Sequence, residues 1–213
     1  MGRKEVFAMH IPSGASQTVE ILSFREALEA APKEPYDESR WLYVPPFYDE
    51  YRYILGTRGD NPLICIGINP STARPGDLDP TLKSVERIAA NNGYDSFIMF
   101  NVYPQRATDP NAMDRAFNRE LHAENLAAFR YVLSLYGEDR RPSVWAAWGT
   151  LIEKRPYLIP AVLDLVALGE EFGAEWLTFG RRSKAGHPHH PLYLRADSTP
   201  EPFDVRAYCK SIS

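Results

Sequence analysis

The sequence predicts an α/β fold, a three-layer sandwich in which helices cover both faces of a central, mostly parallel four-stranded sheet. Two observations predict it. Apolar runs typical of strands buried on both faces alternate along the chain with longer segments in which apolar residues recur every three or four positions. With 213 residues, of which 44% are hydrophobic, the chain is long enough to enclose a large core within one domain.

The first 48 residues are predicted to be an extension, and residues 49–213 a single α/β domain. Within the extension we expect a short helix around Ser23 to Ala31, followed by a connector punctuated by prolines. Because the extension is too short to enclose a core of its own, we expect it to lie against the main domain.

Four strands and three helices alternate through the main domain. The apolar runs that predict strands are residues 63–68, 96–104, 143–149 and 174–180. The segments with helical periodicity lie between them, at residues 79–93, 114–136 and 155–169. For the first helix, Asp79 is the expected N-cap, Pro80 takes the first helical position and Gly93 follows the end.

Composition excludes several classes of protein. The formal net charge of −4 at pH 7 argues against a protein that coats nucleic acid, although a local basic groove is compatible with it. Cys65 and Cys209 lack any Cys-x-x-Cys spacing and are expected to be reduced thiols. No apolar stretch approaches the ~20 residues that span a bilayer, and the first residues do not form a signal peptide. We therefore expect a cytoplasmic protein without a membrane partner.

Polar residues follow each predicted strand, and in open parallel sheets ligands bind beyond the carboxyl ends of the strands. These side chains should therefore meet in space and form a binding site. The candidates at the first three strand ends are Gly67, Ile68, Asn69, Pro70 and Ser71, then Asn101 and Tyr103, then Trp148 with Gly149 and Thr150. The fourth strand leads into GRRSKAGHPHHPLYLR, which carries three of the five histidines.

Asn69 and Asn101 each have two interpretations. Either could simply bond to its own turn or cap a neighbouring loop. An amide also offers a donor and an acceptor together, which suits holding a water molecule or recognising the edge of a nucleobase. The GINPS loop is neither a phosphate-binding P-loop nor a dinucleotide-binding motif, because the required lysine and glycines are missing.

The histidine loop also has more than one interpretation. His187, His189 and His190 could be metal ligands, but no carboxylate or cysteine pair stands at a familiar zinc spacing, and we expect no metal or other cofactor. The prolines instead stiffen a loop that could present a neutral imidazole to developing negative charge, or the histidines are simply solvated. A nearby basic cluster could contact phosphates or form a solvated face: Arg181, Arg182, Lys184 and Arg195.

Two further pairs are expected to be structural. Trp145 and Trp148 should pack in the core and at the strand end rather than form a stacking platform. In the RATDP loop, Arg106 and Asp109 are expected to pair with each other and hold the loop.

Four segments taken together resemble the motifs of the uracil-DNA glycosylase superfamily, in the same order and with similar spacing: GINPS, FNVYP, VWAAWGT and HPHHPLYL. The stretch from about Tyr51 to Leu194 is also similar to the family called domain of unknown function 1643, through INPSTARPGDLDPT, RATDP, EN, AAWG and GHPHHPLYL. That second resemblance covers about two thirds of the chain and names no reaction.

The glycosylase resemblance implies a role for individual residues. Asn69 would place the attacking water, and Asn101 would bind the edge of the base. A histidine of this loop would stabilise the departing base. Because HPHHPL has one residue more than the glycosylase motif, either His187 or His190 could take that place. The basic cluster would hold backbone phosphates, and the remaining strand-end residues would line the base pocket: Gly67, Ile68, Pro70, Ser71, Tyr103 and Trp148.

We therefore expect an enzyme that hydrolyses the N-glycosidic bond of a normal or modified base, with DNA or a nucleotide-like small molecule as its partner. Two alternatives stay open. One is a hydrolase or transferase that acts on a free nucleoside or nucleotide, which the negative net charge favours. The other is a binding module that kept the pocket without the chemistry. The oligomeric state is not predicted.

Overall fold

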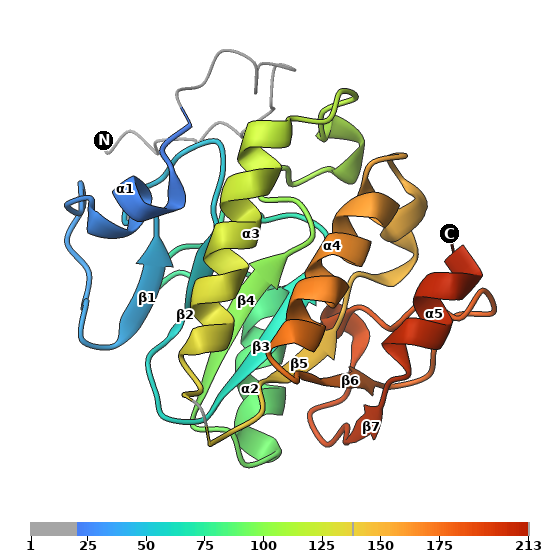
Figure 1. Cartoon of the computed structure of the whole chain (residues 1–213). Helices are drawn as coiled ribbons and strands as arrows, with labels where there is room; N and C mark the ends of the chain where they lie inside the picture. Colours follow the sequence, from blue (N-terminus) through green and yellow to red (C-terminus); the bar gives the residue numbers. More distant parts are fainter. Residues whose placement is uncertain (1–20, 138, 213) are drawn as a thin grey trace, which may run out of the picture.

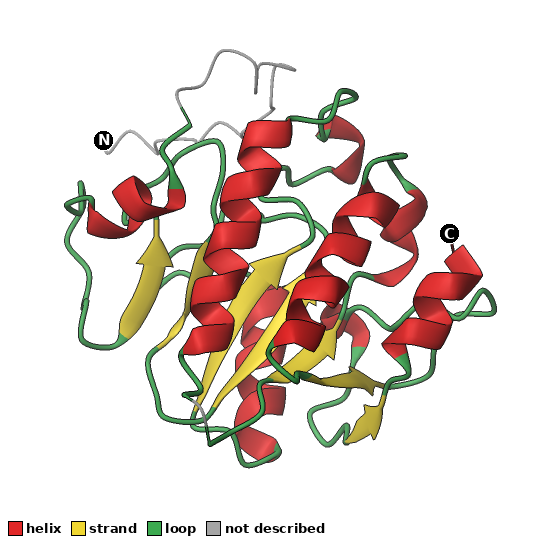
Figure 2. Ribbon diagram, viewed as in Figure 1, coloured by secondary structure: helices red, strands yellow, loops and turns green. Residues whose placement is uncertain are grey.

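The computed structural model describes residues 21–137 and 139–212 (Figure 1). The first 20 residues of the predicted extension therefore lie outside the described residues. Within the described part, five helices and a seven-stranded mixed sheet form an α/β fold. Helices α3 and α4 lie in front of the sheet in Figure 2, and α2 lies behind it.

The four central strands are those that the sequence predicts. They lie in the order β4-β3-β5-β6, and all three pairings between them are parallel. Their bounds are Pro62–Gly67 for β3, Ser96–Asn101 for β4, Ser143–Ala146 for β5 and Glu175–Phe179 for β6. Every residue of β3 and β4 is buried, as expected for apolar runs in strands that are covered on both faces.

Three antiparallel strands extend this sheet, so the prediction of a four-stranded, mostly parallel sheet is wrong. β1 (Trp41–Val44) and β2 (Ile54–Thr57) lie beyond β4, and β7 (Pro200–Pro202) lies beyond β6. β1 falls within the segment interpreted as a connector. β7 is an exposed Pro-Glu-Pro without the alternation that identifies a strand.

Helix α2 (Pro80–Asn91) begins where its capping residues predict. The Asp79 carboxylate accepts a hydrogen bond of 2.8 Å from the backbone N–H of Leu82, and Pro80 takes the first helical position. Helix α1 (Phe24–Glu29) confirms the short predicted helix and is capped by Ser23 and Glu26, which bond reciprocally as a capping box.

Helix α3 (Arg119–Ser134) begins five residues later than predicted, because Asn118 rather than Asp114 caps it. The Asn118 side chain accepts a hydrogen bond of 3.0 Å from Leu121 N. Asp114 is instead bonded to the side chain of Gln105, at 3.0 Å. The last two helices are α4 (Leu158–Glu171) and α5 (Val205–Ile212), which packs against α4.

The core has two parts, one on each face of the sheet. Alternate residues of β3 divide between them: Ile64 and Ile66 pack on the side of α1, α3 and α4, whereas Leu63 and Cys65 pack on the side of α2. Cys65 and Cys209 are buried and are not joined in a disulfide, and burial raises the pKa of both thiols, that of Cys209 to about 11. None of the helices in the described part combines the length and apolarity that crossing a bilayer requires.

The strands that neighbour β3 on its two sides, β4 and β5, are reached by connections that run in opposite directions across the sheet. From β3 the chain passes through α2 to β4 on one side, and it then returns through α3 to β5 on the other side of β3. Such a reversal separates the loops that follow the two strands and opens a crevice at their carboxyl ends. The topology therefore places a ligand site beyond Gly67 and Ala146.

Candidate functional site

A cavity of about 470 Å³ lies at this reversal point. Its walls come from the segments that follow β3, β4 and β5, from the start of α2 and from the histidine loop after β6. The lining residues that the sequence analysis singled out are Gly67, Ile68, Asn69, Ser71, Asn101, Trp148, Gly149, Thr150 and His190. A volume of this size fits a small-molecule site.

Asn69 binds the loop beside it through its amide nitrogen. Nδ2 donates to the carbonyl of Ala107, at 2.7 Å, and to the carbonyl of Pro70, at 3.1 Å. Ala107 N in turn donates to Pro70 O, so the loops after β3 and β4 are joined at this point. Because Nδ2 has both hydrogens engaged, the carbonyl Oδ1 is the atom of this side chain that can accept a hydrogen bond from a water or ligand.

Asn101 is 1% exposed at the end of β4 and is also held by backbone carbonyls. Neighbouring acceptors fix its orientation so that Nδ2 donates to the carbonyls of Phe100 and Asn69, each at 3.2 Å. Asn125 on α3 supports the same strand end, because its Nδ2 donates to Asn101 O at 3.0 Å. The side chain of Asn101 therefore presents its Oδ1 as an acceptor in the cavity.

Gly67 lets these groups approach one another at the end of β3. A Cβ at this position would lie 2.6 Å from Met99 Cε and 3.3 Å from the Asn101 amide. Both neighbours also line the cavity. A larger residue at position 67 would therefore displace the Asn101 amide or fill the cavity.

The structure separates the two histidines that the sequence left as alternatives. His190 lines the cavity, and its Nδ1 accepts a hydrogen bond of 3.4 Å from Leu192 N. Burial lowers the pKa of His190 below its ordinary value of 6.5, so the imidazole is neutral at pH 7. With Nδ1 acting as an acceptor, the proton sits on Nε2, which makes that atom a hydrogen-bond donor.

His187 is 1% exposed and is not among the cavity residues. Its Nδ1 lies 3.0 Å from Tyr208 Oη, and its Nε2 lies 3.2 Å from Glu153 Oε1. Trp148 Nε1 donates to the same Tyr208 oxygen at 2.9 Å. His187 therefore belongs to a hydrogen-bonded chain that joins the cavity wall to α5.

The remaining predicted residues lie outside the cavity lining. Pro70 is buried in the loop, and the Tyr103 hydroxyl accepts a hydrogen bond of 3.2 Å from Asn118 N. None of the four residues of the basic cluster is among the lining residues. Arg195 pairs with Asp197 through two hydrogen bonds of 2.9 Å, and Arg182 lies over the Phe203 ring.

Two charged residues that the sequence analysis did not place in the site also line the cavity, Asp79 and Arg52. The Asp79 carboxylate, which caps α2, also accepts a hydrogen bond from the Ser71 hydroxyl. Arg52 reaches the cavity from the residues before β2 and is 1% exposed. No sequence signal points to Arg52, because the strand that positions it was not predicted.

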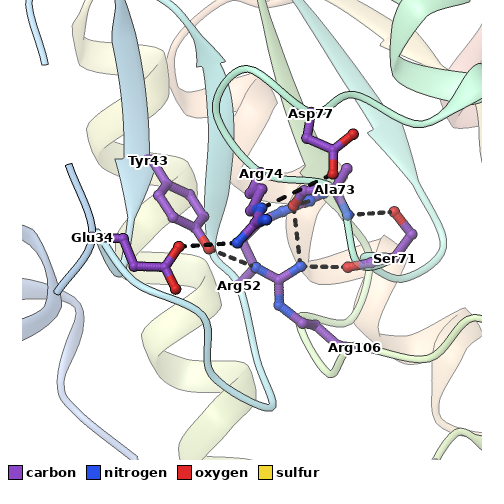
Figure 3. Close-up of polar contacts among 8 residues, drawn as sticks. All are labelled: Glu34, Tyr43, Arg52, Ser71, Ala73, Arg74, Asp77 and Arg106. Carbon is purple, nitrogen blue, oxygen red and sulfur yellow. Dashed lines mark hydrogen bonds and ion pairs between the residues drawn. The ribbon is translucent and has the colours of Figure 1, made fainter. Parts of the chain in front are cut away.

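Arg106 is not among the cavity residues, and it holds the loop that follows β3 (Figure 3). Its Nη1 donates to the carbonyls of Ser71 and Ala73, and its Nη2 donates to Tyr43 Oη at 3.0 Å. The predicted pair between Arg106 and Asp109 is wrong: the Asp109 carboxylate instead caps the short helix at Pro110–Ala112 by accepting from Asn111 N. The RATDP motif therefore fixes the position of the INPSTA loop.

Residues 52–192 match the family model described as protein of unknown function DUF1643. The chain belongs to the DUF1643 family. Searches among curated proteins and among solved structures gave no match.

The DUF1643 match covers the cavity almost completely. It begins at Arg52 and ends at Leu192, so that Tyr193 is the one lining residue outside it. The edge strand β1 and the helix α5 lie outside the matched range. The DUF1643 region therefore contains the central sheet, the strand-end loops and the histidine loop.

Proposed function

We propose that this protein binds a nucleobase in the cavity and hydrolyses the N-glycosidic bond that joins it to a sugar. One observation carries the proposal. Asn69, Asn101 and His190 come from three separate segments, and they line a single cavity together with Trp148. These are the residues to which the resemblance to uracil-DNA glycosylases assigns the water, the base edge and the departing base.

The proposed reaction breaks the C1′–N bond and forms a C1′–O bond with water. Positive charge develops on the sugar, and the base departs with the electron pair of the broken bond. The attacking water donates one hydrogen to Asn69 Oδ1 and releases its proton to solvent after the new bond forms. The base carries its negative charge away or takes up a proton from solvent.

His190 stabilises the negative charge on the departing base. Its neutral ring donates from Nε2 to an exocyclic oxygen of the base, in the manner of an oxyanion donor. Removal of one such donor commonly costs about 10²–10³ in rate. The proposal therefore assigns the catalytic place to His190 and leaves His187 as a structural residue.

Asn101 selects the edge of the base that it faces. Because its Nδ2 hydrogens bind the carbonyls of Phe100 and Asn69, the side chain offers an acceptor to the ligand. A base that presents an N–H donor to Asn101 satisfies it, whereas a base with only an acceptor there leaves two acceptors facing each other.

The test is a base-release assay on single- and double-stranded oligonucleotides that carry uracil, mismatched thymine or modified pyrimidines. Wild type is compared with Asn69→Ala and His190→Gln, and His189→Gln serves as the matched control because His189 does not line the cavity. We expect release that falls about 10²-fold or more in the first two variants and is unchanged in the control. Absence of release from every substrate by folded wild type would contradict the proposal.

A second candidate function is hydrolysis of a free nucleoside or nucleotide in the same cavity. It is favoured because the exposed basic cluster lies outside the cavity and Arg195 is already paired with Asp197. The same assay with free nucleosides and nucleotides distinguishes the two, since binding of a small ligand should depend much less on salt than binding of nucleic acid.

A further inference from the structure

Two guanidinium groups are buried side by side, and one of them borders the cavity. Arg52 and Arg106 are each 1% exposed. Arg52 Nη1 donates to Ala73 O at 3.0 Å, and Arg106 Nη1 reaches the same oxygen at 3.3 Å. The two positive charges therefore share one carbonyl in the loop after β3, as Figure 3 shows.

Neither charge has an ionic partner within the described part of the chain. None of the ion pairs between described residues involves Arg52 or Arg106. The Nε atom of each is buried without a hydrogen-bond partner. Buried charges are normally paired, because an unpaired charge in a low-dielectric interior is costly.

The two arginines differ in their access to the cavity. Arg106 uses both Nη atoms to hold the fold, since they donate to two carbonyls and to Tyr43, and its guanidinium lies over the Tyr48 ring, 4.5 Å from the centroid. Arg52 makes one side-chain hydrogen bond and lines the cavity. Arg52 therefore has donors that the described part of the fold does not use, on a side chain that borders the cavity.

The nearest acidic group in the cavity is already engaged. Asp79 accepts from the Ser71 hydroxyl and from Leu82 N, and it makes no ion pair with Arg52. The single negative charge of Asp79 also does not neutralise the two positive charges of Arg52 and Arg106. Burial, followed by the neighbouring charge of Arg106, lowers the pKa of Arg52 to about 9, and the opposing effect of the Asp79 carboxylate is smaller.

We infer that Arg52 forms an anion subsite in this cavity and binds a phosphate group of the ligand. Guanidinium suits this role because its planar donors match the oxygens of a phosphate. The phosphate could be the monoester of a free nucleotide or a diester of nucleic acid. The link to a nucleotide rests on the proposed function, whereas binding of inorganic phosphate does not.

Isothermal titration calorimetry on the full chain tests the inference with four probes: inorganic phosphate, uridine, uridine monophosphate and a short single-stranded uracil oligonucleotide. Wild type is compared with Arg52→Met, and Arg119→Met is the control because it removes the same charge from an exposed position outside the cavity. Should Arg52→Met fail to fold, Arg52→Lys and the comparison of uridine with its monophosphate on wild type replace it.

We expect wild type to bind inorganic phosphate and to bind uridine monophosphate at least about tenfold more tightly than uridine. Arg52→Met should remove this advantage, Arg52→Lys should reduce it, and Arg119→Met should retain it. Dependence on Arg52 for the monophosphate identifies a free nucleotide, and dependence for the oligonucleotide alone identifies nucleic acid. Both outcomes support the subsite.

Two results would overturn the inference. One is that folded wild type binds none of the phosphate-bearing probes more tightly than uridine. The other is equal phosphate binding by wild type and Arg52→Met. Tight binding of uridine without any phosphate effect would overturn the subsite and leave the proposed function standing. Arg52-dependent phosphate binding without base release would support the subsite and count against the proposed function.

Discussion

At the scale of single residues, the two amides of the cavity are fixed by the backbone around them. The Nδ2 atoms of Asn69 and Asn101 donate to backbone carbonyl groups, at 2.7 to 3.2 Å. A side chain held in this way loses little further freedom when a ligand arrives, so binding costs less conformational entropy. The structural and the functional interpretations of these asparagines are therefore compatible.

His190 leads to a prediction about pH. Its pKa is lowered by burial, so the folded state binds this proton less readily than the unfolded state. Above pH 6.5, the ordinary pKa of histidine, His190 is neutral in both states and its titration does not change the free energy of unfolding. As the pH falls through 6.5 toward the lowered pKa, the unfolded state takes up the proton first, so the folded protein becomes less stable. His190→Asn, which can still accept from Leu192 N, should lose less stability than wild type between pH 8 and pH 5.

Urea unfolding at a series of pH values measures this difference. Since His190→Asn removes the titrating group, the gap between the two proteins should change only on the acid side of pH 6.5. Parallel curves for wild type and variant across the whole range would show that His190 has an ordinary pKa.

At the scale of elements, β2 depends on the absence of a side chain at Gly56. A Cβ there would lie 2.2 Å from Phe97 O and 2.8 Å from Ile98 Cα, and both atoms belong to the backbone of β4. Because these atoms cannot move aside as a flexible side chain would, Gly56→Ala should destabilise the protein by more than about 3 kcal/mol. Thermal unfolding followed by circular dichroism measures this loss of stability.

Gly76→Ala is the control for this prediction. Gly76 has a positive φ of 76°, but among the described residues only its own chain neighbours come within 4 Å of the position that a Cβ would occupy. Its replacement should cost only the backbone strain of about 1–2 kcal/mol. If Gly56→Ala were no more destabilising than Gly76→Ala, the close packing of β2 on β4 would be refuted.

The central strands and the strand-end loops could be predicted from sequence, whereas the sheet edges could not. Continuous apolar runs identified β3, β4, β5 and β6 because both faces of these strands are covered. β1 lies in the proline-rich segment interpreted as a connector, and the short apolar run of β2 ends at Gly56 and Thr57. β7 has no buried residue at all.

The difference between recognisable and unrecognised strands also explains which residues of the candidate site could be predicted. Asn69, Asn101 and Trp148 could be placed together because each follows a recognisable strand, and parallel strands end at a common edge. Arg52 could not, because it precedes the unrecognised strand β2. His187 and His190 are only three residues apart, and contacts with Tyr208 and Leu192, respectively, decide which one lines the cavity. Sequence spacing does not contain that information.

At the scale of the whole molecule, the last helix reaches back to the cavity wall. Tyr208 on α5 accepts from Trp148 Nε1 and donates to His187 Nδ1, and His187 Nε2 then donates to Glu153. All three bonds have consistent donors and acceptors when His187 is neutral. The segment that follows β5, the histidine loop and the C-terminal helix are thereby joined through a single hydroxyl.

Tyr208→Phe should therefore destabilise the protein by about 2–4 kcal/mol, because it leaves two buried polar atoms without a partner. Tyr193→Phe is the control, since Tyr193 is 78% exposed and its hydroxyl should contribute within about 0.5 kcal/mol. Urea unfolding followed by circular dichroism compares the three proteins. Equal midpoints for Tyr208→Phe and wild type would show that this chain of bonds contributes nothing to stability.

The position of Trp148 has a practical consequence. The protein has four tryptophans, and Trp148 is the one that lines the cavity, while Trp41, Trp145 and Trp176 pack elsewhere in the core. An aromatic ligand that entered the cavity would lie close to this buried residue, and we expect it to alter the indole fluorescence. The molecule therefore carries its own optical reporter, with which libraries of unlabelled nucleosides, nucleotides and bases can be screened before any reaction is known.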